Sequence, residues 1–196
     1  MSTSKSKYKI ILGSSSPARK NICEKHGLVF DVVSADINEK AIRENNIRHL
    51  PITLAKAKLE VVRRKVTDAA IIICADTVII SDGELREKPE SQRQLSEWLE
   101  SYANLPIEAI TGIVVYNTAT KQYRETLDSA SVLLKPLPSK LIEELVQRED
   151  FQYASGGIVV EIPALRPYIK KVTGNIETLM GLPGELTLKL INELSQ

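Results

Sequence analysis

The chain has 196 residues, 43% of them hydrophobic, and 26 basic against 25 acidic residues leave a formal charge of +1. This composition argues against disorder and lacks the basic excess of a nucleic-acid binder. Two cysteines and two histidines, without metal-ligand spacing, argue against a disulfide framework or a zinc site. No segment has the apolar length of a signal peptide or a membrane span, so we expect a cytoplasmic protein without nucleic-acid or membrane partners.

The first half of the chain predicts alternating strands and helices. Apolar residues 8–12 indicate a buried strand, and Ser16 and Pro17 are typical of the N-cap and first position of a helix that ends near Gly27. The other elements predicted here are a strand at 28–36, a helix at 52–66, a central strand at 69–80, a turn at 81–84 and a helix after the capping box of Ser91 and Gln94.

The second half predicts paired strands more than helices. The predicted elements are strands near 107–116 and 123–134, a helix from Ser139, strands at 153–163 and 165–172, and a closing helix at 186–194. There are no repeats and no linker long enough to separate independent domains. We therefore expect one domain, residues 1–196, with an α/β fold and a mixed sheet.

The turn after the first strand, Gly13-Ser-Ser-Ser-Pro-Ala-Arg-Lys20, has the features of an anion site. It offers free backbone N–H groups at the start of a helix, small residues that let a ligand approach, and Arg19 in the first helical turn. A phosphate or a carboxylate would suit it. The alternative is that Ser16 only caps the helix and that Arg19 is a solvated cation.

Two charged residues lie where apolar ones are expected. Asp76 interrupts the apolar run of residues 69–80, where an ionised carboxylate is costly unless it is paired or functional. At about 100° per residue, Lys58 falls on the apolar face of its helix and would need an anion there. The alternatives are a structural Asp76 bonded to the backbone or to a lysine, and a Lys58 that extends past the helix edge to solvent.

Together these residues predict metal-assisted attack on a polyphosphate, because cations, hydroxyl groups and carboxylates occur without a suitably placed histidine. Lysines and Arg19 would neutralise phosphoryl oxygens. Asp76 would activate water or hold Mg²⁺, and Glu39 could be a second metal ligand. By itself Lys88 is unremarkable, and on composition alone Glu39 is a solvated charge.

Six segments, in order and with compatible spacing, resemble the Maf family of nucleoside triphosphate pyrophosphatases over nearly the whole chain. They are ILGSSSPARKNI, LAKAKLEVV, CADTVIISDGELREKP, TGIVV, SGGIVVE and TLMGLP. The resemblance implies a mixed, curved sheet flanked by helices, with two lobes around a central cleft, and frequent homodimers. It also implies house-cleaning hydrolysis of nucleoside triphosphates to monophosphate and pyrophosphate with Mg²⁺, or with Mn²⁺ or Co²⁺.

The resemblance also assigns roles to individual residues. Ser14 and Arg19 match the family's phosphate-binding turn, and Asp76 matches its catalytic base. Lys58 and Lys88 match its helix and K-P lysines, which we group with Asp76 as catalytic. Glu39 matches the acidic residue after the second strand, which we assign with Asp76 to the metal.

Three further positions, which select the base in the family, are Ala18, Thr77 and Glu161 here. Thr77 is typical of the branch that acts on dTTP and UTP, whereas Glu161 is typical of the branch that acts on 7-methyl-GTP. The carboxylate of Glu161 would accept hydrogen bonds from guanine and attract a positively charged, methylated purine. The departures at Ala18 and after Glu161 leave a second hypothesis, a nucleotide-binding regulator of growth or division with weak catalysis. A third is hydrolysis of inosine or xanthosine triphosphates.

Overall fold

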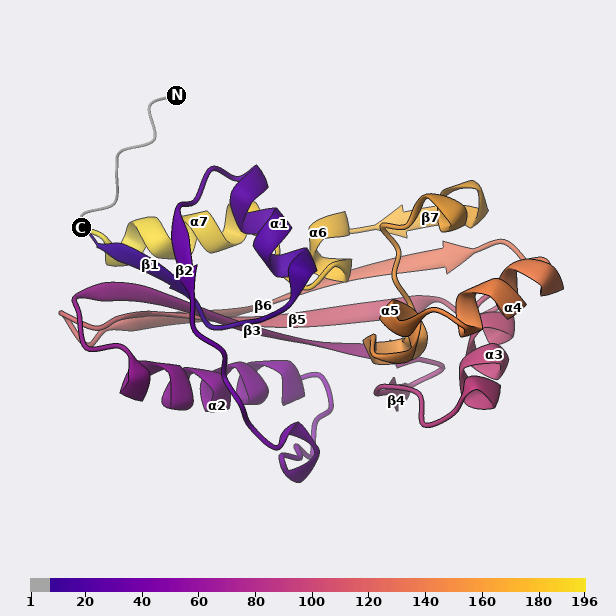
Figure 1. Ribbon diagram of the computed structural model, residues 1–196, viewed down its shortest axis with the longest axis horizontal. Coiled ribbons are helices and arrows are strands. Elements are labelled where there is room, and N and C mark those ends of the chain that lie inside the picture. Colours follow the sequence, from indigo (N-terminus) through magenta and orange to yellow (C-terminus); the bar gives the residue numbers. More distant parts are fainter. Residues whose placement is uncertain (1–7) are drawn as a thin grey trace. The chain divides into compact units, whose positions relative to one another are not determined.

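The computed structural model describes residues 8–196 (Figure 1). Its strands are β1 (Lys9–Leu12), β2 (Phe30–Val32), β3 (Ala70–Ser81), β4 (Glu84–Arg86), β5 (Ile107–Asn117), β6 (Tyr123–Leu134) and β7 (Ile169–Thr173). Its α-helices are α1 (Pro17–Lys25), α2 (Leu50–Lys65), α3 (Gln92–Ser101), α4 (Ser139–Val146), α5 (Glu149–Gln152), α6 (Ile176–Leu179) and α7 (Gly184–Leu194). Three short 3-10 helices are η1 (Glu39–Ala41), η2 (Ser155–Gly157) and η3 (Pro163–Tyr168).

The strands form a mixed sheet in the order β2-β1-β3-β5-β6-β7, with β4 paired to β3. Strand β1 runs parallel to both β2 and β3, whereas β4 is antiparallel to β3 and β7 is antiparallel to β6. The α/β fold with a mixed sheet is therefore confirmed. No helix within residues 8–196 combines the length and the apolar character needed to cross a bilayer.

The chain divides into two compact units. The first contains the residues up to Asp76 together with Thr111–Leu127 and Gly181–Gln196, and the second contains Thr77–Ile110 and Asp128–Met180. Strands β3, β5 and β6 contribute residues to both units. The expectation of a single domain over residues 1–196 stays a prediction.

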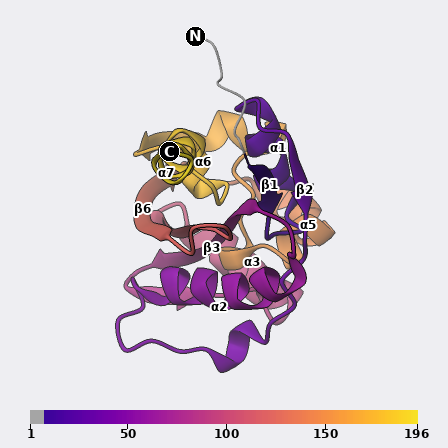
Figure 2. The same ribbon diagram turned by 90° about the vertical axis from the view of Figure 1, so that its left-hand side faces the viewer.

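The first unit is built in three layers. Helix α2 covers one face of the sheet, and helices α1 and α7 lie on the other (Figures 1 and 2). A buried cluster between α2 and the sheet consists of Ile11, Ala55, Leu59, Val62, Ala70, Ile72, Cys74, Val114 and Tyr116. Eleven of the twelve residues of β3 are buried, which agrees with its prediction as a central strand.

Helix α2 lies very close to the sheet. A Cβ atom placed on Gly112 of β5 would lie 2.5 Å from the backbone nitrogen of Ile52, so only glycine leaves room for the first turn of the helix. Farther along, Lys58 lies among the buried residues of α2, as its helical position predicted. The close approach of α2 therefore carries a charged side chain into the interior of the unit.

The second unit packs α3 against α4, α5 and η2. The predicted capping box at the start of α3 is present in a modified form. Ser91 Oγ accepts a hydrogen bond from the backbone N–H of Gln94 at 3.1 Å, while Gln94 Oε1 accepts from the backbone N–H of Glu90 at 2.7 Å. The box thus fixes the loop immediately before the helix as well as its first turn.

The predicted strand at 153–163 is wrong, and the one predicted at 165–172 is only partly right. Gly156 and Gly157 have φ angles of 66° and 56°, which extended strands do not adopt, and they form η2. Pro163 and Pro167 lie in η3, and a strand appears only at β7. The apolar residues after Gly157 do enter the core, so their hydrophobicity reports burial rather than strand pairing.

The predicted turn at 81–84 is confirmed, but it also joins two strands. Asp82 and Gly83 both have positive φ angles, 54° and 75°, and Ser81 pairs with Glu84 across them. Such a two-residue turn is typical of a tight β-hairpin. It returns the chain along β3 as β4, a strand that the sequence did not predict.

Candidate active site

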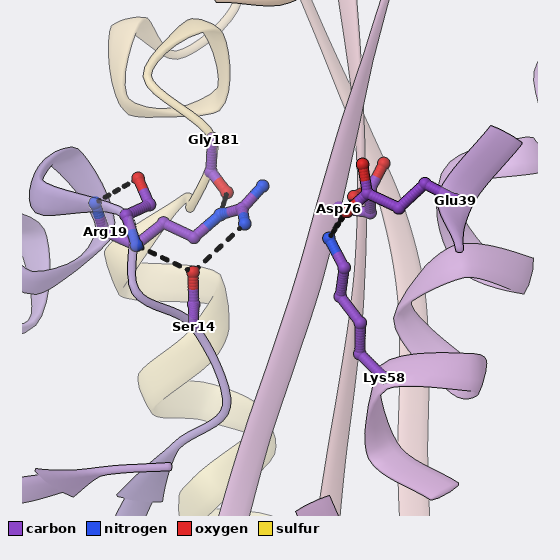
Figure 3. Close-up of polar contacts among 7 residues, drawn as sticks. Ser14, Arg19, Glu39, Lys58, Asp76 and Gly181 are labelled. Carbon is purple, nitrogen blue, oxygen red and sulfur yellow. Dashed lines mark hydrogen bonds and ion pairs between the residues drawn. The ribbon is translucent and has the colours of Figure 1, made fainter. Parts of the chain in front are cut away.

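The predicted anion turn joins β1 to α1 in the first unit. Ser14 Oγ accepts hydrogen bonds from the backbone N–H of Ser16 at 3.2 Å and from an Nη atom of Arg19 at 3.3 Å. The Nε atom of Arg19 donates to the carbonyl oxygen of Gly181 at 2.9 Å (Figure 3). Arg19 is thus fixed from both sides, by the turn itself and by the segment that precedes α7. Its orientation is set before any ligand arrives.

Gly13 allows the turn to rest directly on β3. Its N–H donates to the carbonyl oxygen of Ile73 at 2.8 Å. A Cβ atom at this position would lie 2.4 Å from the sulfur of Cys74 and 3.1 Å from Val62 Cγ2, which is closer than such atoms pack. The glycine is therefore needed for close approach.

On strand β3, Asp76 faces the ammonium group of Lys58. Lys58 Nζ lies 2.5 Å from Asp76 Oδ1 and 2.7 Å from Glu39 Oε1 (Figure 3). The side chains of Lys58 and Asp76 are 9% and 10% exposed, whereas Glu39 is 42% exposed. One buried cation thus joins two carboxylates from separate parts of the chain, β3 and η1.

Burial raises the pKa of Asp76, because loss of water penalises the charged form. The positive charges of Lys58 and Arg19 oppose this shift and lower the pKa, while the negative charge of Glu39 adds to it. Both cations act on the same carboxyl group. The protonation state of Asp76 therefore depends on the charges of Lys58, Arg19 and Glu39.

Cys74 lies two residues before Asp76 but is not equipped as a nucleophile. Burial raises the pKa of its thiol to about 12, despite the opposing charges of Lys58 and Arg19. A thiolate is the reactive form of cysteine, and it is scarce at neutral pH with such a pKa. Covalent catalysis by Cys74 is therefore disfavoured, and the carboxylates are the groups left to act on water.

The remaining predicted residues divide between the units. Ala18 is half-buried in the first turn of α1, with Arg19 beside it in the chain. Thr77, Lys88 and Glu161 belong to the second unit. Thr77 is half-buried and follows Asp76 on β3, and Lys88 is exposed in the loop between β4 and α3.

Glu161 is half-buried in the second unit, after η2. Burial raises the pKa of its carboxyl group, and the charge of Asp150 raises it further. A carboxylate in such a position is favoured by a cationic partner.

Glu39 and Asp76 are the carboxylates of this site that could hold a divalent metal. Among residues 8–196 there is no group of three or more histidine, cysteine, aspartate or glutamate side chains able to hold a metal ion. Glu39 and Asp76 supply only two carboxylates, and both already contact Lys58. Mg²⁺ often binds through one or two carboxylates plus substrate phosphates, and this pair fits that pattern.

Two contributions to this geometry were missed by sequence reasoning. The carbonyl oxygen of Gly181 orients Arg19, and Gly13 sets the depth of the turn. Both glycines lie in segments that resemble the family, but a glycine has no functional group that would identify it as a site residue. A glycine amid an otherwise patterned segment is the available signal, because it indicates close backbone approach or a positive φ angle, and Gly181 has a φ of 101°.

Comparison with known proteins gives a consistent picture. A family model described as Maf-like protein matches residues 9–194. A 7-methyl-GTP pyrophosphatase of Dictyostelium discoideum is 35% identical over 194 residues, covering 95% of this chain and 98% of that protein. A 7-methyl-GTP pyrophosphatase of Idiomarina loihiensis is 31% identical, covering 93% and 92%. A dTTP/UTP pyrophosphatase of Clostridium tetani is 28% identical, covering 94% and 96%.

Proposed function

Since this chain belongs to the Maf-like protein family, we propose that it is a nucleoside triphosphate pyrophosphatase that releases a nucleoside monophosphate and pyrophosphate. The relatives whose names state this activity match nearly the full length of the chain. The observation that carries the proposal is the buried Lys58 ammonium between Asp76 and Glu39 in the same unit as the oriented guanidinium of Arg19. This unit combines cations that would neutralise phosphoryl oxygens with carboxylates that would activate water.

In the proposed reaction, water attacks the α-phosphorus and the bond from that atom to the α–β bridging oxygen breaks. Asp76 takes the proton of the water, and the bridging oxygen leaves with the pyrophosphate. The raised pKa of Asp76 makes this carboxylate a stronger base than that of an ordinary aspartate. The guanidinium of Arg19 and the hydroxyl of Ser14 hold phosphoryl oxygens, and Lys88 neutralises charge on the phosphates.

We propose Mg²⁺ as the cofactor, with Glu39 and Asp76 as its protein ligands and Mn²⁺ or Co²⁺ as substitutes. Bound there, the cation would neutralise phosphate charge and polarise the phosphoryl group. Lys58 would then give up part of its contact with the two carboxylates and turn toward phosphate oxygens. Without nucleotide, the ammonium of Lys58 keeps the two carboxylates from repelling one another.

For the base, we propose a 7-methylated guanine nucleotide. Its positive charge would compensate the half-buried carboxylate of Glu161, and two relatives named for this substrate are 35% and 31% identical to the chain. Ala18 and Thr77 would also influence which base the enzyme accepts. A pyrimidine nucleotide is the competing substrate, because relatives named for dTTP and UTP also match and because Thr77 is typical of that branch.

The test is a panel of nucleoside triphosphates that includes 7-methyl-GTP, GTP, dTTP, UTP, ITP and XTP. The protein is assayed with Mg²⁺ and with the metal chelated, and monophosphate, pyrophosphate and orthophosphate are measured separately. We expect metal-dependent release of pyrophosphate, with 7-methyl-GTP turned over fastest. Orthophosphate as the first product, or no turnover of any nucleotide by a folded protein, contradicts the proposed reaction. Faster turnover of dTTP or UTP contradicts only the proposed base.

A further inference from the structure

We propose that Tyr102 is a positioning residue for Lys88, acting through the glycine turn of η2. This inference rests on the proposed function, in which Lys88 contacts the phosphates, and it concerns only the second unit. Lys88 itself is exposed. The residue before it, Glu87, in contrast, has its carbonyl oxygen fixed by a backbone hydrogen bond.

The glycine turn holds the backbone next to Lys88. The N–H of Gly156 donates to the carbonyl oxygen of Glu87 at 2.8 Å. A Cβ atom on Gly157 would lie 2.3 Å from Leu95 and 3.7 Å from Pro89, so a side chain here would collide with Leu95. The turn is thus hydrogen-bonded to the residue immediately before the lysine.

Only glycines allow the turn to take this position. Gly156 and Gly157 both have left-handed φ angles, and a Cβ atom on Gly156 would lie 2.6 Å from Cγ2 of Ile79. The turn is therefore pressed between β3 and the loop that carries Lys88. A conformation of this kind persists only when its surroundings hold it.

Tyr102 holds the same turn through a second hydrogen bond. Its buried hydroxyl donates to the carbonyl oxygen of Gly156 at 2.6 Å. The peptide groups of the turn thereby link the phenol of Tyr102 to the carbonyl of Glu87, since Gly156 accepts from one and donates to the other. Loss of the hydroxyl would leave a buried carbonyl without this donor and loosen the turn.

Arg86 braces the ring of Tyr102. Its guanidinium carbon lies 4.7 Å from the centroid of the Tyr102 ring and 5.5 Å from that of Trp98, and one of its Nη atoms donates to Ser101 Oγ at 2.9 Å. Arg86 is only 7% exposed. A buried, stacked guanidinium holds an aromatic ring in one orientation, and Arg86 is only two residues from Lys88 in the chain.

A double-mutant cycle between Tyr102→Phe and Lys88→Ala tests the inference. Tyr102→Phe keeps the ring over Arg86 and removes only the hydroxyl. We expect it to lower kcat about fivefold, with KM changed less than about twofold. In the Lys88→Ala background the same substitution should change kcat by less than about twofold, because the lysine it positions is absent. A fivefold loss in both backgrounds overturns the inference.

Hydrogen exchange supplies a readout that does not depend on activity. In Tyr102→Phe the amide of Gly156 should exchange about fivefold faster than in the parent protein, and peptides covering residues 86–90 should lose protection with it. Arg86→Lys should give the same pattern, because lysine keeps the charge but not the stacked plane. Unchanged exchange in both variants overturns the inference even if the protein proves to hydrolyse no nucleotide.

Val132→Ala is the matched control for general destabilisation. Val132 is fully buried in the same core, but it pairs with Val172 of β7 rather than with the lysine loop. We expect it to lower the melting temperature at least as much as Tyr102→Phe while leaving the exchange of Gly156 unchanged. Faster exchange of Gly156 in Val132→Ala would show that any loss of stability opens the turn, and would overturn the role given to Tyr102.

Discussion

The ammonium nitrogen of Lys58 lies 2.5 Å from Oδ1 of Asp76, and both side chains are nearly removed from solvent. Glu39 approaches the same ammonium at 2.7 Å from a much more exposed position. Removal of the cation would leave two facing carboxylates, one of them buried. This arrangement makes the lysine important for the folded state itself and not only for the proposed reaction.

Lys58→Met should therefore destabilise the protein by about 3 kcal/mol at neutral pH, because a buried carboxylate loses its partner. The loss should shrink as the pH falls, because protonated Asp76 no longer needs a cation. Denaturant unfolding of both proteins at several pH values measures the difference. A loss that stays constant from neutral to acidic pH would show that the packing of the lysine stem, rather than its charge, stabilises the site.

Glu39→Gln should move the acidic limb of the pH–rate profile to lower pH. The negative charge of Glu39 raises the pKa of Asp76, so its removal makes Asp76 easier to ionise, and an ionised Asp76 is needed as base. Rates at saturating nucleotide and Mg²⁺ are measured across the acidic range. Glu60→Gln is the control, since Glu60 pairs with exposed Arg63 on the surface of α2. A limb that does not move would show that the charge of Glu39 does not influence the titrating group.

Asp76→Asn should change how stability depends on pH. Because burial raises the pKa of Asp76, the folded chain keeps this proton to higher pH than the unfolded chain. The group's contribution to stability is fully present below the ordinary pKa of aspartate and is lost as the pH rises through the raised pKa. The asparagine variant lacks this term, so its stability relative to the parent should rise over that window and then level off. Paired unfolding curves measure it, and turnover should fall at least about a hundredfold.

Arg19→Lys should lower kcat/KM by roughly tenfold to a hundredfold, because lysine cannot bind Gly181 and Ser14 together and still present a planar donor to phosphate. We expect the loss chiefly in KM. Arg64→Lys, on the exposed end of α2, should leave the kinetics unchanged. Equal kinetics for Arg19→Lys and the parent would contradict the proposed phosphate contact.

Gly13→Ala should destabilise the protein by about 1–3 kcal/mol, because the added methyl group would meet the sulfur of Cys74. Cys74→Ala in the same chain should restore part of this loss. The double variant will not recover fully, since Val62 also lies 3.1 Å from the added carbon. Additive effects of the two substitutions would show that the turn avoids the contact by moving outward.

The sequence predicted the buried members of the site better than the exposed ones. Lys58 and Asp76 are charged residues at positions where the pattern predicts apolar ones. We therefore expected both in the interior, and both are buried in the structure. Glu39 gave no such signal, because it lies on a half-exposed 3-10 turn in an irregular segment. Its contact with Lys58 depends on tertiary placement, which periodicity does not report.

Hydrophobic content also misled the strand prediction after Ser155. Ile158, Val160 and Ile162 are apolar and buried as in a strand, but the two preceding glycines and the prolines of η3 give the chain a different path. Burial is encoded in side chains, whereas the path of the backbone was decided here by residues that lack a Cβ atom or a backbone donor. The catalytic, binding and metal roles of all the predicted site residues stay predictions.

The close approach of Gly112 to the first turn of α2 has a consequence for how this chain can vary. That glycine bears no functional group, yet it fixes how deeply the helix that carries Lys58 sits against the sheet. Substitutions that change charge on the outer face of α2 should be tolerated widely, while the smallest increase in size at residue 112 should displace the helix. A deep mutational scan should therefore find strict size limits at a position that carries no functional group.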